Sequence, residues 1–385
     1  MEADEVTWCS HYPVGSDRKV TPSGRQRDVI VLGSGIAGLS VADAAVKHGK
    51  SCTVIDIHPQ GRGASAAPAM LINPAAGKRA RRTWRTEPAF KAITGLLKRV
   101  EKRTGQQFYE IRGVIRPALT EKMAEDFQRT PFKYEWDEGW LEWMDREAFA
   151  LRFPYLRNPY GGLFIHQAAT VAGAQFNAAL VQYLESYGVH FIFGSASQPR
   201  RMNDLWQIRT DEGVFQSPVL IDASGVSQST SPWWEHLPLH PVKGQTVSYK
   251  FSKPLPLDAS ISGMGYLAFL STTPYELTVG STYEHQFDHP EPDQEGMKAI
   301  GMKLEKMLPG YSGAVEDARG WSGVRVTLPD KQPVIGSHHA LPGLYLIGAM
   351  GSKGLLLARY LADLLMRHIL TGVEIPEEVS IRRYL

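Results

Sequence analysis

The stretch that decides the fold of this 385-residue chain is Val29-Ile30-Val31-Leu32-Gly33-Ser34-Gly35-Ile36-Ala37-Gly38. An apolar strand runs into G-x-G-x-x-G, and the residues that follow predict a helix over 36–48. A helix N-terminus in that place directs backbone N–H groups at a pyrophosphate. The next predicted strand, 52–56, ends in Asp56, where a carboxylate can accept the hydroxyls of an adenosine ribose. The pattern therefore predicts a dinucleotide-binding βαβ unit.

A second glycine-rich turn lies near the other end of the chain: Leu346-Ile347-Gly348-Ala349-Met350-Gly351-Ser352-Lys353-Gly354. It precedes a predicted helix over 355–370. The backbone amides at the start of this helix, together with Lys353, can stabilise the negative charge that develops at the N1–C2=O edge of a flavin when it is reduced. An ordinary glycine turn between strand and helix is the alternative. We expect FAD rather than NAD, because this segment returns to the first motif and no second G-x-G-x-x-G is present to receive a nicotinamide.

Composition sets wider limits. The chain is 43% hydrophobic and 21% charged, so it can bury a large core and is long enough for about two domains. A net charge of +2 requires no nucleic acid or anionic membrane as a global partner. The only cysteines are Cys9 and Cys52, which favours a reducing compartment, and no apolar run approaches the ~18 residues of a membrane span. We expect a cytoplasmic protein.

Changes in composition and in hydrophobic pattern along the chain predict two discontinuous domains. The polar start, 1–26, lacks an apolar period and is expected to be a flexible extension. A Trp-rich region and alternating strands such as 244–249 and 276–280 interrupt the nucleotide-binding pattern, which resumes with an amphipathic helix expected over 166–187. We assign an FAD-binding domain to 27–89, 161–235 and 321–385, and a substrate domain to 90–160 and 236–320.

Several further motifs carry a resemblance to a known family. They are Gly63-Ala64-Ser65, Ile221-Asp222-Ala223-Ser224-Gly225, Val242-Lys243-Gly244-Gln245, Gly280-Ser281-Thr282-Tyr283-Glu284 and Gly323-Val324-Arg325. Together with both glycine turns, they resemble the D-amino-acid-oxidase-like superfamily of FAD-dependent oxidoreductases over about residues 28–370. Within it, the chain looks most like the flavin oxidase domain of the bacterial bifunctional tRNA wobble-uridine modifying protein, with glycine and sarcosine oxidases next.

The resemblance implies a fold and a chemistry. The fold is a glutathione-reductase-like FAD-binding Rossmann domain (α/β) beside an antiparallel-sheet substrate domain (α+β), with the flavin between them. The chemistry is oxidation of a C–N bond next to a carboxylate, by hydride transfer to flavin N5 and hydrolysis of the imine, with oxygen or a quinone as the electron acceptor. Some sarcosine oxidases bind flavin through a late cysteine, and none follows Cys52 here.

The motifs and the resemblance together assign residues to FAD. The expected cofactor-binding residues are Gly33, Gly35, Ile36, Ala37, Gly38, Asp56, Ala64, Ser65, Ala223, Gly225, Gly348, Gly351, Ser352, Lys353, Gly354 and Leu355.

Two residues are expected to face the substrate. Arg325 matches the arginine that binds the substrate carboxylate in the family, and a guanidinium suits this role because it offers two parallel donors and stays charged when desolvated. A structural salt bridge is the alternative. Tyr266 corresponds to a position on the substrate side of the ring, although an aromatic residue on a strand is more often part of the core. We assign no catalytic base, since a deprotonated amine can release hydride directly.

The densest basic run is Lys78-Arg79-Ala80-Arg81-Arg82-Thr83-Trp84-Arg85. At helical spacing, Lys78, Arg81, Arg82 and Arg85 would share one face and attract a polyanion such as tRNA, whereas a solvated helix face is the alternative. Two substrate carriers therefore fit an N–CH2–COO⁻ unit: a free small amine or amino acid, and carboxymethylaminomethyl-uridine in tRNA. A non-catalytic FAD-binding subunit is a further alternative. No histidine has the spacing of a metal ligand, so we expect no metal.

Overall fold

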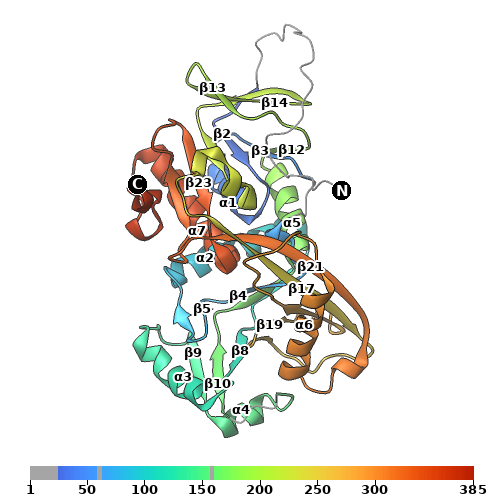
Figure 1. Ribbon diagram of the computed structural model, residues 1–385. Helices are drawn as coiled ribbons and strands as arrows, with labels where there is room; N and C mark the ends of the chain where they lie inside the picture. The colour runs from blue at the N-terminus through green and yellow to red at the C-terminus, as the bar shows by residue number, and fades with distance from the viewer. Residues whose placement is uncertain (1–24, 59–62, 157–159) are drawn as a thin grey trace.

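The computed structural model describes residues 25–58, 63–156 and 160–385. Two large β-sheets organise this part of the chain (Figure 1). A six-stranded sheet with helices α1, α2, α5 and α7 forms the upper part of the view, and an eight-stranded sheet with α3, α4 and α6 forms the lower part. The strands β17 and β21 lie between them, where the two parts meet.

The six-stranded sheet has the order β12-β3-β2-β16-β23-β22. All its neighbours pair in parallel except β22, which is antiparallel to β23. Parallel strands joined through helices are the pattern of a Rossmann-type domain, as expected from the sequence. The strands are β2 (Val29–Leu32), β3 (Cys52–Asp56), β12 (His190–Phe193), β16 (Leu220–Asp222), β22 (Val334–Ser337) and β23 (Leu344–Gly348).

Alternation along β2 shows how this sheet is covered on both faces. Val29 and Val31 belong to a core formed with the helices, whereas Ile30 and Leu32 belong to another core that includes Trp206 of the small upper sheet. The helices are α1 (Ile36–Lys47), α2 (Thr86–Thr104), α5 (Gly173–Glu185) and α7 (Gly354–Thr371). The small sheet consists of β1 (Arg25–Gln26), β13 (Arg200–Met202), β14 (Leu205–Thr210) and β15 (Gly213–Ser217).

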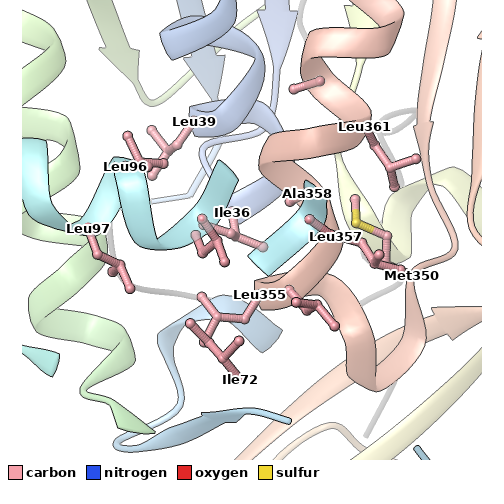
Figure 2. Packing of buried hydrophobic residues seen from close by; sticks show 14 of the residues in the cluster. Ile36, Leu39, Ile72, Leu96, Leu97, Met350, Leu355, Leu357, Ala358 and Leu361 are labelled. Atoms are coloured by element: carbon pink, nitrogen blue, oxygen red, sulfur yellow. The ribbon is translucent and has the colours of Figure 1, made fainter. Parts of the chain in front are cut away.

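Packing between α1, α2 and α7 connects the two ends of the sequence. Figure 2 shows Ile36 of α1 beside the first turns of α7, which supply Leu355, Leu357, Ala358 and Leu361. Leu39 of α1 and Leu96 and Leu97 of α2 belong to the same buried cluster. This apolar packing places the N-terminus of α7 next to that of α1. In the described part of the chain, no helix has the length and apolar character needed to cross a membrane.

The eight-stranded sheet has the order β21-β17-β20-β19-β18-β8-β10-β9, and its pairs are antiparallel except β18 with β8. The long strands β17 (His240–Phe251) and β21 (Val315–Thr327) form its first pair. The others are β8 (Val114–Pro117), β9 (Leu141–Met144), β10 (Gly162–Ile165), β18 (Ser260–Ser262), β19 (Tyr266–Ala268) and β20 (Glu276–Gly280). The accompanying helices are α3 (Glu121–Lys133), α4 (Arg146–Arg152) and α6 (Gln294–Met307).

Short strands join the two parts. β4 (Met70–Ile72), β11 (Ala169–Val171) and β7 (Tyr109–Glu110) form a three-stranded sheet, and β5 (Ala75–Ala76) pairs with β6 (Arg81–Arg82). The helix expected over 166–187 is present but shorter: Ala169–Val171 form β11, and α5 begins only at Gly173.

The division into two domains remains a proposal. Strand β10 pairs within the eight-stranded sheet, although residues from 161 onward were assigned to the FAD-binding domain, and β21 crosses the proposed boundary at 321. Sheet membership thus favours moving both boundaries. At the N-terminus, Arg25 and Gln26 form β1, which pairs in parallel with β15, while the rest of the expected extension, 1–24, lies outside the described residues.

Candidate active site

A cavity of about 1130 Å³, part of it open to solvent, lies where the carboxyl ends of the parallel strands meet β21. Ligands of open α/β sheets bind in this place. Its walls include most of the residues expected to bind FAD: Gly33, Gly35, Ile36, Ala37, Asp56, Ala64, Ser65, Ala223, Gly225, Gly348, Gly351 and Gly354. Arg325 lines the same cavity, whereas Gly38, Ser352, Lys353, Leu355 and Tyr266 are not in its walls.

The first glycine turn is shaped by close backbone approaches. Gly33 has φ +97°, and a Cβ atom there would lie 2.6 Å from the carbonyl oxygen of Ala223. A Cβ atom on Gly38 would overlap the carbonyl oxygen of Gly33, so Gly38 permits α1 to pack on the turn. The hydroxyl of Ser65 accepts a hydrogen bond from the Ile36 N–H (3.0 Å), which ties the Ala64–Ala66 turn to the start of α1.

Asp56 holds this glycine turn in place. Its Oδ2 accepts hydrogen bonds from the backbone N–H and the hydroxyl of Ser34, both 2.7 Å, and its Oδ1 accepts from the His58 N–H (3.0 Å). The carboxylate also lines the cavity, so the expected contact with the adenosine ribose stays a prediction that is compatible with its position. Its contact with Ser34 is a second, structural role.

The C-terminal turn reaches the cavity through Gly348, Gly351 and Gly354. Lys353 instead donates a hydrogen bond to the Lys331 carbonyl (2.7 Å), and burial lowers the pKa of its ammonium group. Leu355 is 6% exposed and belongs to the helical core. The proposed contacts of Lys353 and Leu355 with the cofactor therefore stay predictions.

Arg325 lies on β21, opposite Val242 of β17. Its Nη2 donates to the Thr282 carbonyl (3.2 Å), and its Cζ lies 4.6 Å from the ring centroid of Tyr283. Among the described residues, no carboxylate forms an ion pair with it. A structural salt bridge, the alternative weighed for this residue, is thus not formed within that part of the chain.

Tyr266 lies on β19, on the far side of β20 from β17. Its hydroxyl donates to the Ala69 carbonyl (3.3 Å), and its ring lies over Gly280, where a Cβ atom would come within 2.8 Å of it. Burial raises the pKa of its phenol well above the usual range. The ring thus contacts the segment that follows Ala64 and Ser65, and its role toward substrate stays a prediction.

The basic run 78–85 does not form a helix, and the expectation of a shared helical face was wrong. β5 and β6 form a hairpin through a turn over residues 77–80, and α2 begins only at Thr86. Pro88 explains this start, because proline is tolerated in a first helical turn but not in a helix interior. Arg82 is partly neutralised by Asp137, 2.5 Å away. Lys78, Arg79, Arg81 and Arg85 are exposed, and no ion pair within the described residues involves them.

Gln228 and Tyr283 are two residues of the site that the sequence analysis did not single out. The Gln228 amide is 1% exposed, lines the cavity, and donates to the Asp222 carbonyl (3.0 Å) and the Ile347 carbonyl (3.1 Å). It thereby links the ends of β16 and β23. Its position just after the Asp222–Gly225 motif was the one available signal. Tyr283 is 62% exposed, and its signal was the Gly280–Glu284 motif, in which no role had been assigned to it.

Comparison with known proteins identifies the class of this site. Residues 28–367 match the family described as DAO, FAD dependent oxidoreductase. The protein therefore belongs to this family, and it is an enzyme whose cofactor is FAD. Family, fold class and cofactor agree with the expectations from the sequence.

Curated relatives include two functional types. The tRNA 5-methylaminomethyl-2-thiouridine biosynthesis bifunctional protein MnmC of Thiobacillus denitrificans is 26% identical over 94% of this chain and 59% of the relative. The glycine oxidase of Pseudomonas aeruginosa is 24% identical over 88% of this chain and 94% of the relative. The chain thus spans about three fifths of the bifunctional relatives' length.

Solved structures support the same fold. A glycine oxidase from Geobacillus kaustophilus superimposes with a TM-score of 0.80 at 21% identity, covering 91% of this chain and 96% of that one. The iminodiacetate oxidase IdaA of Chelativorans sp. BNC1 gives a TM-score of 0.72 at 20% identity, covering 92% and 98%.

Proposed function

We propose that this enzyme oxidises the C–N bond of a primary or secondary amine that carries an N–CH2–COO⁻ unit. The products are the reduced cofactor and an imine, which water hydrolyses to the free amine and a carbonyl compound. Its relatives named as a glycine oxidase and an iminodiacetate oxidase support this substrate class, since both named substrates contain the unit.

The observation that carries the proposal is the state of Arg325. Its guanidinium lines the cavity, and within the described residues it contacts a carbonyl oxygen and an aromatic ring but no acid. A half-buried cation without a counter-ion is costly, and a substrate carboxylate would supply one through two parallel hydrogen bonds. Arg325 is thus suited to fix the substrate by its carboxylate.

The other residues of the site would hold the cofactor and exclude water. The glycine turn and Asp56 suit the nucleotide. The Ala64–Ala66 turn and the N-terminus of α7 suit the flavin ring. FAD, when bound, supplies the hydride acceptor. Tyr266, whose hydroxyl donates to the Ala69 carbonyl, would border the substrate side. No protein base is assigned, because an amine that binds in its neutral form needs none.

An anaerobic titration tests this function. Purified holoenzyme is mixed with glycine, sarcosine or iminodiacetate, and the oxidised flavin band is followed. We expect one of these amines to bleach the band, with the corresponding amine and carbonyl product formed in equal amounts. Methylamine, which lacks the carboxylate, should fail. Bleaching by methylamine as readily as by the amino acids would contradict the assignment of a carboxylate-dependent oxidase.

A second candidate places the same unit on tRNA. The exposed basic side chains in and just after the β5–β6 hairpin, which form no ion pair within the described residues, favour it, as does the name of the bifunctional relatives. Arg116, which is 4% exposed, supports the hairpin by donating to the carbonyls of Ala75 (2.5 Å) and Gly77 (2.6 Å). Burial lowers the pKa of this guanidinium to about 10.

The tRNA candidate has its own test. We expect the double variant Arg81→Gln, Arg85→Gln to bind tRNA bearing carboxymethylaminomethyl-uridine about tenfold more weakly, with a shallower salt dependence, because two phosphate contacts are lost. The control is Lys298→Gln, Lys306→Gln on α6, where both lysines are exposed. Equal affinities for the two double variants, or bleaching of the flavin by small amines alone, would leave the free amine as the substrate.

A further inference from the structure

Both contacts of Arg325 come from one short segment, Ser281–Glu284, which we name the clamp segment. Thr282 provides the carbonyl oxygen and Tyr283 provides the ring. The segment follows β20 and is not itself a regular strand. The direction of the guanidinium therefore depends on whatever holds this segment against the sheet.

Strand β17 holds the clamp segment through its backbone. Lys243 and Glu284 exchange two backbone hydrogen bonds, both 3.0 Å. The Gln245 N–H donates to the Thr282 hydroxyl (2.9 Å), and the Thr282 N–H donates to the Gln245 carbonyl (3.2 Å). The Thr282 hydroxyl in turn donates to the Glu284 carboxylate. Through this last hydrogen bond, the position of Thr282 also depends on where the Glu284 side chain lies.

A buried lysine places that side chain. The Lys243 side chain is 2% exposed, and its Nζ lies 2.9 Å from Asp293 Oδ2 and 3.6 Å from Glu284 Oε2. The Gln245 amide also donates to both carboxylates, at 2.7 Å to Asp293 and 2.9 Å to Glu284. Two carboxylates this close repel one another unless a cation compensates them, and within the described residues Lys243 is the cation that does so.

Asp293 connects this network to α6. Its Oδ1 accepts from the Gly296 N–H (2.8 Å) as the N-cap of the helix, and its own N–H donates to the Gln245 side chain (2.8 Å). The cap, Lys243 and Gln245 lower the pKa of Asp293 to about 2, so the carboxylate stays charged across the working range of pH. From the same helix, Lys303 Nζ donates to the Ser281 carbonyl (2.6 Å).

We propose that Lys243 and Asp293 are positioning residues that orient Arg325 toward the substrate carboxylate by fixing the clamp segment to α6. The path runs from Asp293 through Lys243 and Glu284 to Thr282, whose carbonyl contacts the guanidinium. The inference rests on the proposed role of Arg325. It adds that the Val242–Gln245 motif serves substrate affinity and not only sheet formation.

Binding of methoxyacetate to the oxidised holoenzyme tests the inference. This compound matches sarcosine in shape but has no amine, and its Kd is read from the change in flavin absorbance. We expect Asp293→Asn and Lys243→Met each to weaken its binding about tenfold, the size that follows from losing one well-aligned hydrogen bond to a charged group. With an amine substrate, KM should rise similarly while the limiting rate of flavin reduction changes less than twofold.

The variants separate positioning from general damage. Asparagine is itself a good N-cap, so Asp293→Asn keeps α6 capped while removing the charge, and it decides the question if Lys243→Met fails to fold. Lys243→Arg restores the cation and should restore affinity. Lys298→Met, on the exposed face of α6, is the matched control and should bind methoxyacetate like the unmodified enzyme.

Three outcomes have distinct meanings. If Asp293→Asn binds methoxyacetate normally while Arg325→Ala does not, the inference is wrong and the proposed function stands. If Asp293→Asn loses FAD, or is no longer folded under the conditions of the binding assay, along with affinity, the role is merely structural and the inference is also wrong. If the unmodified enzyme neither responds to methoxyacetate nor is reduced by any N–CH2–COO⁻ amine, the proposed function itself fails.

Discussion

The guanidinium of Arg325 fills the space that a side chain on Gly244 would occupy. A Cβ atom on Gly244 would overlap Nη2 and lie 2.8 Å from Cζ of Arg325. Gly244 is therefore required by the arginine and not by its own backbone. The two residues lie 81 positions apart (325 − 244) and meet because β17 pairs with β21.

Gly244→Ala should therefore displace Arg325 while leaving the residues expected to bind FAD in place. We expect KM for the amine substrate to rise at least about tenfold, because overlap with a backbone-fixed methyl group moves the guanidinium from its hydrogen-bonding position. FAD content, measured by absorbance after denaturation, should stay stoichiometric. Gly301→Ala is the control, since a Cβ atom there meets only the Tyr249 hydroxyl at an ordinary 3.6 Å. Unchanged KM in Gly244→Ala would contradict the assignment of Arg325.

Arg325→Lys tests whether the two parallel N–H donors of the guanidinium matter for substrate binding, and not only its positive charge. A lysine keeps the charge but cannot form two parallel hydrogen bonds to one carboxylate. We expect kcat/KM to fall by about tenfold to a hundredfold, the range for one lost charge-assisted hydrogen bond. Arg325→Ala should cost more. Steady-state kinetics with sarcosine or glycine measure both, and equal values for lysine and arginine would show that charge alone suffices.

Asp56→Ala should weaken FAD binding through the glycine turn. The substitution removes the acceptor of three hydrogen bonds, from the N–H and hydroxyl of Ser34 and from the N–H of His58. If FAD binding has to re-order the turn, the lost bonds, at about 1 kcal/mol each, allow the Kd for FAD to rise by at most roughly a hundredfold. Ser34→Ala, which removes only the hydroxyl, should cost less than about tenfold. Fluorescence titration of the apoprotein with FAD gives both values, and a larger effect of Ser34→Ala would reverse the interpretation.

The Asp293 carboxylate should make stability depend on acid pH. Its pKa is lowered from 3.8 to about 2 in the folded protein, so the carboxylate contributes stability above pH 4 that disappears as the pH falls through about 2. We expect the difference in free energy of unfolding between the unmodified protein and Asp293→Asn to shrink over that range. Urea unfolding at steps between pH 5 and pH 2.5 measures it. If this difference in free energy of unfolding grew as the pH fell, the pKa of the Asp293 carboxyl group would be raised in the folded protein and not lowered.

Local patterns were enough to predict the nucleotide-binding part. The first strand, the helix and the second strand were expected over 28–32, 36–48 and 52–56, and β2, α1 and β3 match them closely. The reason is that each element is defined by residues next to one another: an apolar run, glycines where the backbone needs them, and an acid at the strand end.

Predictions failed where distant segments decide the local structure. The basic run was expected to be helical from its spacing, but Pro88 delays α2, and the hairpin before it is held by Arg116 from another strand. The residues 166–171 were expected within a helix, yet Ala169–Val171 pairs with β4 and β7 and becomes a strand. Sequence spacing alone does not contain these partners.

The chain's glycine turns and their spacing were sufficient to predict the cofactor, because FAD binding needs particular backbone shapes within a few consecutive residues. The resemblance to the family came from these turns together with the further motifs. The substrate side depends instead on pairing between strands far apart in the chain. Gly244, Thr282 and Arg325 come together only through the register of β17, β20 and β21, and the charge of Lys243 acts on them only because α6 packs behind that sheet. Long-range contacts of this kind follow from the folding of the whole core, which no short stretch of sequence encodes.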